Sequence, residues 1–120
     1  HPKDLQNHSL LKFISPRWNE WNLNSGKENY RLQAQAKLSG NDFKLIKHWV
    51  IQNQGIALLP SFLCQEDLRK GDLVSVLPKW RTSDMPIHFV YPPMTFTAVK
   101  VRKFIDICGP VFEQKLKLLR

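Results

Sequence analysis

The stretch "LSGNDFKLIKHWVIQNQGIALLPSFLCQEDLRKGDLVSVLP", residues 38–78, decides the fold of this chain. In its first half, apolar side chains recur at helical spacing and predict a helix over residues 41–54 with one buried stripe. The members of this stripe are Leu45, Ile46, Trp49 and Val50. The unbroken apolar run at residues 56–59 follows at once, as in strands that are buried on both faces.

The ends of this helix are marked by polar residues and by a glycine. Either Ser39 or Asn41 is expected to cap it, because a side-chain oxygen there can accept a hydrogen bond from a free N–H of the first turn. Asp42 suits the positive end of the helix dipole. Gly55 is expected to end the helix, because glycine adopts the left-handed conformation at little cost.

A second, shorter helix is predicted after the 56–59 run. Ser61 can cap this helix, and Gly71 closes it. The segment "DLVSVLP", residues 72–78, then alternates between two faces, which predicts a further strand.

Two strands are predicted upstream. The apolar run "LLKFI", residues 10–14, fits a buried strand. Residues 31–38 alternate between apolar and polar side chains, which is typical of a strand with one face in water. Asn24, Ser25 and Gly26, between these two strands, have the composition of a turn, so a turn is predicted there. The strands at 31–38 and 56–59 are expected to pair in parallel through a right-handed helical crossover.

Downstream, the segment "MPIHFVYPP", residues 85–93, predicts an apolar strand between prolines. Residues 97–108 have the apolar periodicity of a helix, which Gly109 and Pro110 are expected to break or kink. The predicted fold class is therefore α/β, with a mixed, mostly parallel sheet flanked by helices.

In open α/β sheets, ligands bind outside the carboxyl ends of the parallel strands. Here those ends fall near positions 15, 40 and 60, where hydroxyl, amide and free N–H groups follow each strand. Helix N-termini at such turns favour anions. The sequence therefore predicts that three chain reversals meet at one edge of the sheet and present polar groups to a small molecule.

Composition narrows the function. The net charge is +8, but residues 1–40 carry +3, residues 41–94 carry +1 and residues 95–120 carry +4, with no basic run interleaved with aromatic residues. This distribution favours solvated surface charge over nucleic-acid binding. No apolar run is long enough for a membrane span, and the first residues of the given sequence do not show the charged-then-apolar pattern of a signal peptide. We expect a cytoplasmic location, with Cys64 and Cys108 as reduced thiols.

No catalytic, metal or cofactor motif is present in the sequence. The four histidines, at positions 1, 8, 48 and 88, do not fall at metal-ligand spacing with cysteine or carboxylate residues. No glycine-rich phosphate loop occurs. The predicted turns carry serine, asparagine, proline and Arg17 instead of clustered titratable groups, which argues against an enzyme.

Taken in order, several phrases of the chain resemble the second half of the effector-binding domain of LysR-type transcriptional regulators. They are "HPKDLQNHSLLKF", a tryptophan-containing hairpin-like stretch, "NDFKLIKHWVIQNQGIALLPSFLCQEDLRKGDLVSVLPKW", "PIHFVYP" and "KVRKFIDIC". Each phrase is weak alone, but their order and spacing over essentially the whole chain are specific.

This resemblance implies a Rossmann-like lobe of a type II periplasmic-binding-protein fold. Residues 1–86 would form regulatory subdomain II, and residues 87–120 would form the crossover strand and the C-terminal helix that return to subdomain I. The N-terminal helix-turn-helix and most of subdomain I would be missing, because the sequence starts at His1 within a helical phrase. DNA binding would then belong to the missing N-terminal domain.

The resemblance also implies a small-molecule effector, often a carboxylate, in a cleft between two lobes. Arg17 could pair with a carboxylate through two hydrogen bonds, although a solvated loop arginine remains an alternative. Ser39 and Asn41 could cap a helix, contact the effector, or do both. The positions carried over as cleft-lining are Ser15, Arg17, Ser39, Asn41, Ser61 and Phe62.

Two other classes remain open at this point. A lobe of a solute-binding protein without a DNA role predicts a signal peptide in the parent gene, whereas a regulator predicts a helix-turn-helix upstream. An enzyme fragment predicts titratable groups at the strand ends. Finally, the apolar face of helix 97–108, with Val101, Phe104 and Ile105, is expected either to fold back on this lobe or to dock on a second copy. We favour the second outcome, which predicts a homo-oligomer formed through this helix.

Overall fold

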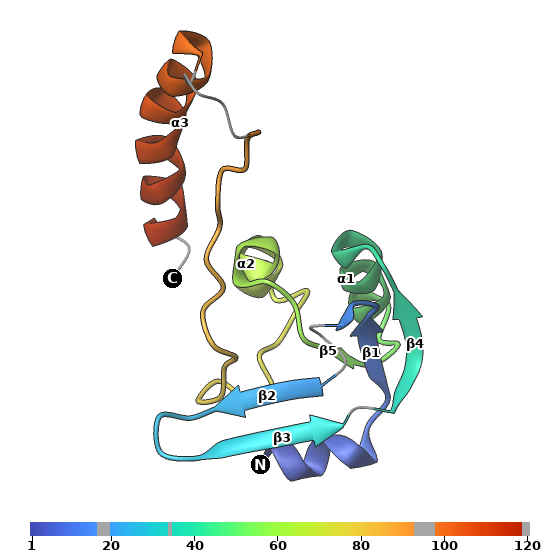
Figure 1. Ribbon diagram of the computed structural model, residues 1–120. Helices are drawn as coiled ribbons and strands as arrows, with labels where there is room; N and C mark the ends of the chain where they lie inside the picture. Colours follow the sequence, from blue (N-terminus) through green and yellow to red (C-terminus); the bar gives the residue numbers. More distant parts are fainter. Residues whose placement is uncertain (17–19, 34, 93–97, 119–120) are drawn as a thin grey trace. The chain divides into compact units, whose positions relative to one another are not determined.

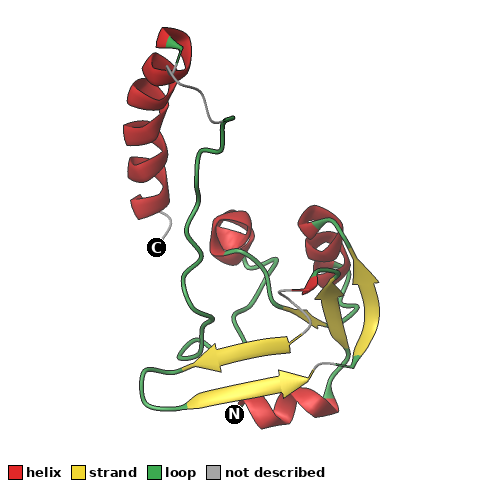
Figure 2. Cartoon of the chain, in the orientation of Figure 1, coloured by secondary structure: helices red, strands yellow, loops and turns green. Residues whose placement is uncertain are grey.

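The computed structural model describes residues 1–16, 20–33, 35–92 and 98–118. The chain divides into two compact units, His1–Asp84 and Met85–Arg120. Figures 1 and 2 show the helices and strands of each unit.

The first unit contains a parallel three-stranded sheet in the order β4-β1-β5. The central strand β1 (Leu10–Phe13) pairs in parallel with β4 (Ala36–Gly40) and with β5 (Ile56–Ala57). The parallel sheet is therefore confirmed. The expected direct pairing between the strands at 31–38 and 56–59 is wrong, because β1 lies between them and accepts a neighbour on each side.

A separate antiparallel hairpin consists of β2 (Glu20–Asn24) and β3 (Asn29–Gln33). The predicted strand at 31–38 is thus divided, with its start in β3 and its end in β4. Alternation of side chains shows which residues share a face, but it does not show to which sheet a run belongs. The predicted turn is confirmed, because the backbone N–H of Gly26 donates to Asn24 Oδ1 at 2.6 Å.

Helix α1 (Phe43–Ile51) is shorter than predicted, and its ends differ from the expected ones. Asp42, and neither Ser39 nor Asn41, caps its start. At its other end Asn53 takes the left-handed conformation, with φ of 57°. Gly55 therefore does not close the helix.

Gly55 instead allows a close approach between two strands. Its φ of 155° lies in a region that side chains rarely adopt, and a Cβ added there would overlap the carbonyl oxygen of Ser9. The next residue, Ile56, donates its backbone N–H to the same oxygen at 2.9 Å. The glycine thus lets β5 begin directly beside β1.

Helix α2 (Ser61–Lys70) ends at Gly71 in the left-handed conformation, with φ of 84°, as predicted. Its start differs from the prediction, because Pro60 is the N-cap residue and Ser61 is the first helical residue. No side chain caps this end of α2.

The core of the first unit joins the parallel sheet, the hairpin and the N-terminal 3₁₀-helix η1 (Pro2–Asn7). Its buried members are Leu5, Leu10, Trp21, Leu23 and Leu32. Ile46 of α1 is also fully buried, whereas Leu45 is 42% exposed, so the predicted stripe of α1 is only partly correct. Burial of each such side chain contributes about 1.5–3 kcal/mol.

Two predicted strands are absent from the described part of the chain. Residues 73–77 and 86–91 form no β-ladder, and Val74 and Val90 are 80% and 92% exposed. An apolar alternating run becomes a strand only where a neighbouring strand offers its backbone groups. Within the residues that the structure describes, these two runs have no such neighbour.

The second unit contains helix α3 (Val99–Leu118). This helix runs through Gly109 and Pro110, so of the two predicted outcomes, a break or a kink, the break does not occur. A proline removes one backbone hydrogen bond of a helix, and the remaining hydrogen bonds of a long helix can keep it continuous. The ring of Phe89 makes edge-to-face contacts with Phe104 and Phe112, at centroid distances of 6.2 and 5.9 Å.

Candidate functional site at the carboxyl edge of the parallel sheet

The three parallel strands end at one edge of the sheet. Phe13 at the end of β1 pairs with Gly40 at the end of β4, and Leu11 pairs with Ala57 of β5. One residue past β1, the backbone N–H of Ile14 donates to the carbonyl of Gly40 at 2.8 Å. The predicted meeting of strand ends therefore follows from the parallel pairing.

The structure places five of the six predicted site residues along this edge or at the start of α2. Ser15 follows β1 and is half-buried, whereas Ser39 and Asn41 at the end of β4 are exposed. Ser61 and Phe62 begin α2, a few residues beyond β5, and are exposed. Arg17 lies outside the described residues.

A carboxylate closes the N-terminus of α1. Oδ1 of Asp42 accepts a hydrogen bond from the backbone N–H of Lys44 at 2.7 Å. The sequence predicted only that Asp42 would suit the helix dipole, although aspartate is as good an N-cap as asparagine. The cap leaves the side chains of Ser39 and Asn41 exposed and places a negative charge at this part of the edge.

The N-terminus of α2 is different, because no side chain caps it. Its first backbone hydrogen bond runs from Leu63 N–H to the carbonyl of Pro60 at 3.0 Å. The positive end of the α2 dipole is therefore not neutralised by a capping carboxylate, and this end is more favourable to an anion than that of α1.

Two features of this region were missed by the sequence analysis. The rings of Phe13 and Phe43 stack at a centroid distance of 4.0 Å and an angle of 13°, which joins the end of β1 to the start of α1. The only available signal was that each phenylalanine stands at a boundary of a predicted element.

The second feature is an ion pair between the two helices. Lys47 Nζ of α1 donates to Asp67 Oδ2 of α2 at 2.7 Å and to the carbonyl of Leu63 at 3.1 Å. The hydrogen bond from Lys47 lowers the pKa of Asp67. This pair fixes α1 against α2 and hence their N-termini at the edge of the sheet. No local sequence pattern relates two residues that lie 20 positions apart.

A cavity of about 280 Å³, called the apolar slot below, is lined mainly by residues of β5, of α2 and of the segment 73–77. Trp21 and Leu23 of the hairpin also line it. Of the predicted site residues, Ser61 belongs to its lining and the described others do not. The slot is therefore distinct in character from the polar edge.

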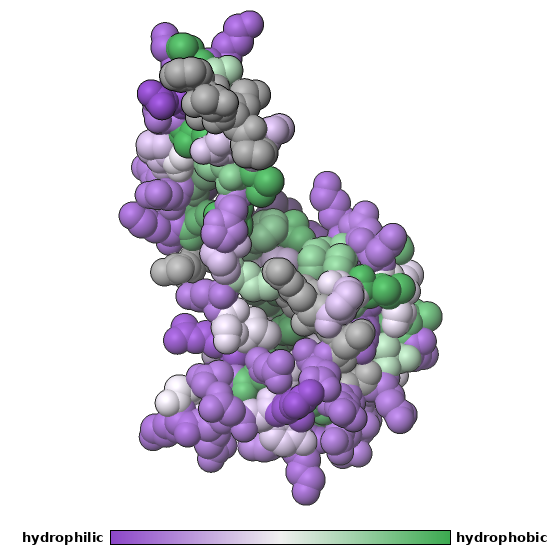
Figure 3. Space-filling model, in the orientation of Figure 1, coloured by the Kyte–Doolittle hydropathy of each residue, from purple (hydrophilic) through white to green (hydrophobic). Residues whose placement is uncertain are grey.

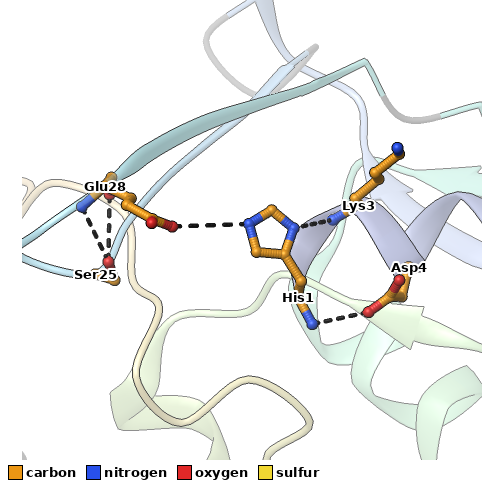
Figure 4. A network of polar contacts seen from close by, with 5 residues as sticks. All are labelled: His1, Lys3, Asp4, Ser25 and Glu28. Carbon is orange, nitrogen blue, oxygen red and sulfur yellow. Dashed lines mark hydrogen bonds and ion pairs between the residues drawn. The ribbon is translucent and has the colours of Figure 1, made fainter.

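The His1 imidazole holds η1 against the hairpin (Figure 4). Its Nδ1 accepts from the backbone N–H of Lys3 at 3.2 Å, and its Nε2 lies 3.8 Å from Glu28 Oε2. Its ring edges also contact Tyr30 and Trp80, with centroids 5.3 Å apart in each case. These contacts give His1 a packing role.

The described residues contain neither a metal centre nor a membrane-spanning helix. No three histidine, cysteine or carboxylate residues gather there as a metal site would require. None of the helices in the described ranges combines the length and apolar character needed to cross a bilayer.

Comparisons with known proteins agree with this architecture. The protein-family model named LysR substrate binding domain matches residues 1–113 of this chain. The chain is 30% identical over 112 residues to the HTH-type transcriptional regulator PtxR of Pseudomonas aeruginosa, covering 88% of this chain and 36% of PtxR. It is 26% identical over 120 residues to the transcriptional activator AaeR of Escherichia coli, covering 99% of this chain and 39% of AaeR.

Solved structures show the same likeness. The regulatory domain of AphB from Vibrio vulnificus superimposes with a TM-score of 0.61 at 28% identity, over 67% of this chain and 40% of that one. Full-length AphB of Vibrio cholerae, a virulence activator, gives a TM-score of 0.61 at 27% identity over 67% of this chain and 27% of that one. The chain thus spans less than half the length of each of these relatives.

The parallel sheet, its two flanking helices and the match over residues 1–113 lead to one conclusion. The chain belongs to the LysR substrate-binding domain family, the effector-binding domains of LysR-type transcriptional regulators, which are not enzymes.

Proposed function

We propose that this chain is the effector-sensing part of its regulator, and that the carboxyl edge of β4, β1 and β5 forms one wall of the effector site. A second lobe would cover this edge and complete an interlobe cleft. The observation that carries the proposal is the parallel pairing of the three strands, because it brings their polar turns to the same edge.

A small carboxylate is the ligand class that we propose for this edge. The uncapped start of α2 offers N–H groups and the positive end of a helix dipole. Asp42 disfavours an anion at the start of α1, so the carboxylate would lie nearer to α2. The proposed contacts remain those carried over from the family resemblance, namely Ser15, Arg17, Ser39, Asn41, Ser61 and Phe62.

In the parent protein, the effector would bridge the two lobes and shift the population of closed states. This shift would change how the oligomer spaces its DNA-binding domains, so the promoter would respond to the effector. Such coupling requires the effector to bind the two states with different affinities. A solute-binding lobe could share this fold, but the HTH-type relatives favour the regulator.

The test is calorimetric titration of the intact regulatory domain with small carboxylates and with their neutral amides. Asp42→Asn keeps a capping side chain but removes its charge, so it should tighten carboxylate binding and leave amide binding unchanged. Ser61→Ala should weaken carboxylate binding roughly fivefold, the equivalent of about one neutral hydrogen bond.

Ser83→Ala serves as the control, because Ser83 is exposed and lies outside the proposed edge. Unchanged affinity in Asp42→Asn and in Ser61→Ala, with the fold intact by circular dichroism, would remove both helix N-termini from the effector site.

We also propose that copies of this chain associate through the second unit. In α3, Phe104 is exposed whereas Val101 and Ile105 are half-buried, so this helix retains apolar surface for a partner. Apolar surface (green) is visible among polar side chains in Figure 3.

A further inference from the structure

The central strand β1 presents different side chains to the two faces of the parallel sheet. Side chains alternate along a strand, so Leu10 and Lys12 point to one face, and Leu11 and Phe13 to the other. Leu10 belongs to the core that the sheet shares with the hairpin, and its partner Ile56 of β5 packs against the same core. Lys12 therefore lies on the core-facing side of the sheet, one residue before the end of β1.

The opposite face of the sheet edge is closed by α1. The ring of Phe13 stacks on that of Phe43 at a centroid distance of 4.0 Å. A Cβ added to Gly40 would lie 3.4 Å from the ring of Trp49. These rings leave little room for a ligand group beside Gly40, so a small molecule at this edge would meet the face that carries Lys12.

The position of Lys12 is unusual for a cation. This side chain is half-buried, and lysines on the core side of a strand are rarely buried without a carboxylate partner. Within the described ranges no carboxylate forms an ion pair with Lys12, whereas Lys47 and Lys70 each have one. The aliphatic stem of Lys12 can lie along the core while its ammonium group reaches the rim of the sheet.

Ser39 stands beside Lys12 on the neighbouring strand. The two residues are direct partners in the register of β1 and β4, so their side chains leave the sheet on the same face. Ser39 is exposed and does not cap α1, because Asp42 does. An ammonium group and a hydroxyl group side by side can donate a charged and a neutral hydrogen bond to one carboxylate.

We propose that Lys12 supplies the positive charge that pairs with the effector carboxylate, and that the Ser39 hydroxyl is a second donor. This inference rests on the proposed function and adds a residue that the family resemblance did not single out. Because β1 lies between β4 and β5, a carboxylate on Lys12 stays within the edge that leads from Ser39 to the start of α2. Lys12 would therefore determine the selection of a carboxylate over its neutral amide.

The test measures this selection by calorimetry on the intact regulatory domain. The probes are acetate, succinate and benzoate, each compared with its neutral amide and titrated into the millimolar range. Lys12→Gln should weaken carboxylate binding about tenfold to hundredfold, the equivalent of one charged hydrogen bond, and leave amide binding unchanged. Lys12→Arg keeps the charge and should retain most of the carboxylate affinity.

Two further variants separate charge from position. Lys37→Gln is the control, because it removes the same charge from an exposed position near the start of β4 and should change neither affinity. Ser39→Ala should weaken carboxylate binding about fivefold, as expected for a neutral hydrogen bond. Ser39 is exposed, so this variant should fold even if Lys12→Gln does not.

The outcomes distinguish this inference from the proposed function. Carboxylate binding that Lys12→Gln and Ser39→Ala leave unchanged would overturn the role of Lys12 while the carboxylate edge stands. No binding of any carboxylate probe would overturn both. A lower urea midpoint of the ligand-free Lys12→Gln domain, with unchanged carboxylate affinity, would show that Lys12 belongs to a structural ion pair instead.

Discussion

Segments with a strand-like hydrophobic pattern occur in two parts of the chain, residues 10–57 and residues 73–91, but only those in the first part form a parallel sheet within the described residues. Upstream, the runs that end in β1, β4 and β5 pair with each other and bury Leu10 and Leu11. Downstream, two runs of the same alternating or apolar character remain outside any ladder in the described chain. This difference teaches that a hydrophobic pattern identifies a candidate strand, but the segment becomes a strand only where a neighbouring strand offers unpaired backbone groups.

The largest expected effect tests this difference directly. Leu32→Ala, at a fully buried position, should lower the free energy of unfolding by about 2–5 kcal/mol because it leaves a cavity in the core. Val74→Ala, at an 80% exposed position, should change it by less than about 0.5 kcal/mol in dilute solution. Urea denaturation of both variants provides the measurement. Equal losses would show that residues 73–77 are as well packed as the hairpin.

A second pair of variants compares the stability cost of replacing two glycines, Gly55 before β5 and Gly71 before residues 73–77. Gly55→Ala should destabilise the fold by about 3 kcal/mol, because it combines backbone strain with overlap against the Ser9 carbonyl. Gly71→Ala has a positive φ but no neighbouring atom within 4 Å, so its cost should be only about 1 kcal/mol. Thermal unfolding ranks the two. If Gly71→Ala proved the more harmful, the close approach of β5 to β1 would not be the decisive constraint.

The smallest effect concerns the ion pair that joins α1 of the first region to α2. The pKa of Asp67 in the folded state lies below its usual value, so the pair stabilises the fold above the pKa of the unfolded state. This contribution disappears as the pH falls through the folded-state pKa. Lys47→Met should therefore reduce stability at neutral pH, and its difference from the parent chain should shrink in acid.

The control is Lys70→Met, which removes the exposed pair between Lys70 and Glu66. Exposed pairs of this kind contribute little, so a smaller change than for Lys47→Met is expected. Urea midpoints measured across the acid range test both. A pH-independent effect of Lys47→Met would mean that the aliphatic stem of the lysine, and not its charge, holds the helices together.

The candidate edge was predictable from the order of the elements along the chain. The apolar run at 56–59 follows directly on a helix that itself follows a strand, and this strand–helix–strand order implies two parallel strands that end at the same edge of the sheet. The chemistry of each helix start was less predictable. Ser39, Asn41 and Asp42 are all competent caps, and only backbone geometry selected Asp42. At α2, the proline at position 60 took the place that Ser61 was expected to fill.

The sequence by itself determined the α/β class, the parallel sheet, the end of α2 at Gly71 and the family. These features rest on local periodicity, local capping chemistry and the order of short motifs. Only the tertiary structure decided that residues 31–38 divide between two sheets and that β1 lies between β4 and β5. It also decided that Lys47 meets Asp67, and that residues 73–77 line an apolar slot. The physical reason is that such contacts join residues far apart in the chain, so their free energy depends on which backbone edges and side chains become neighbours after folding.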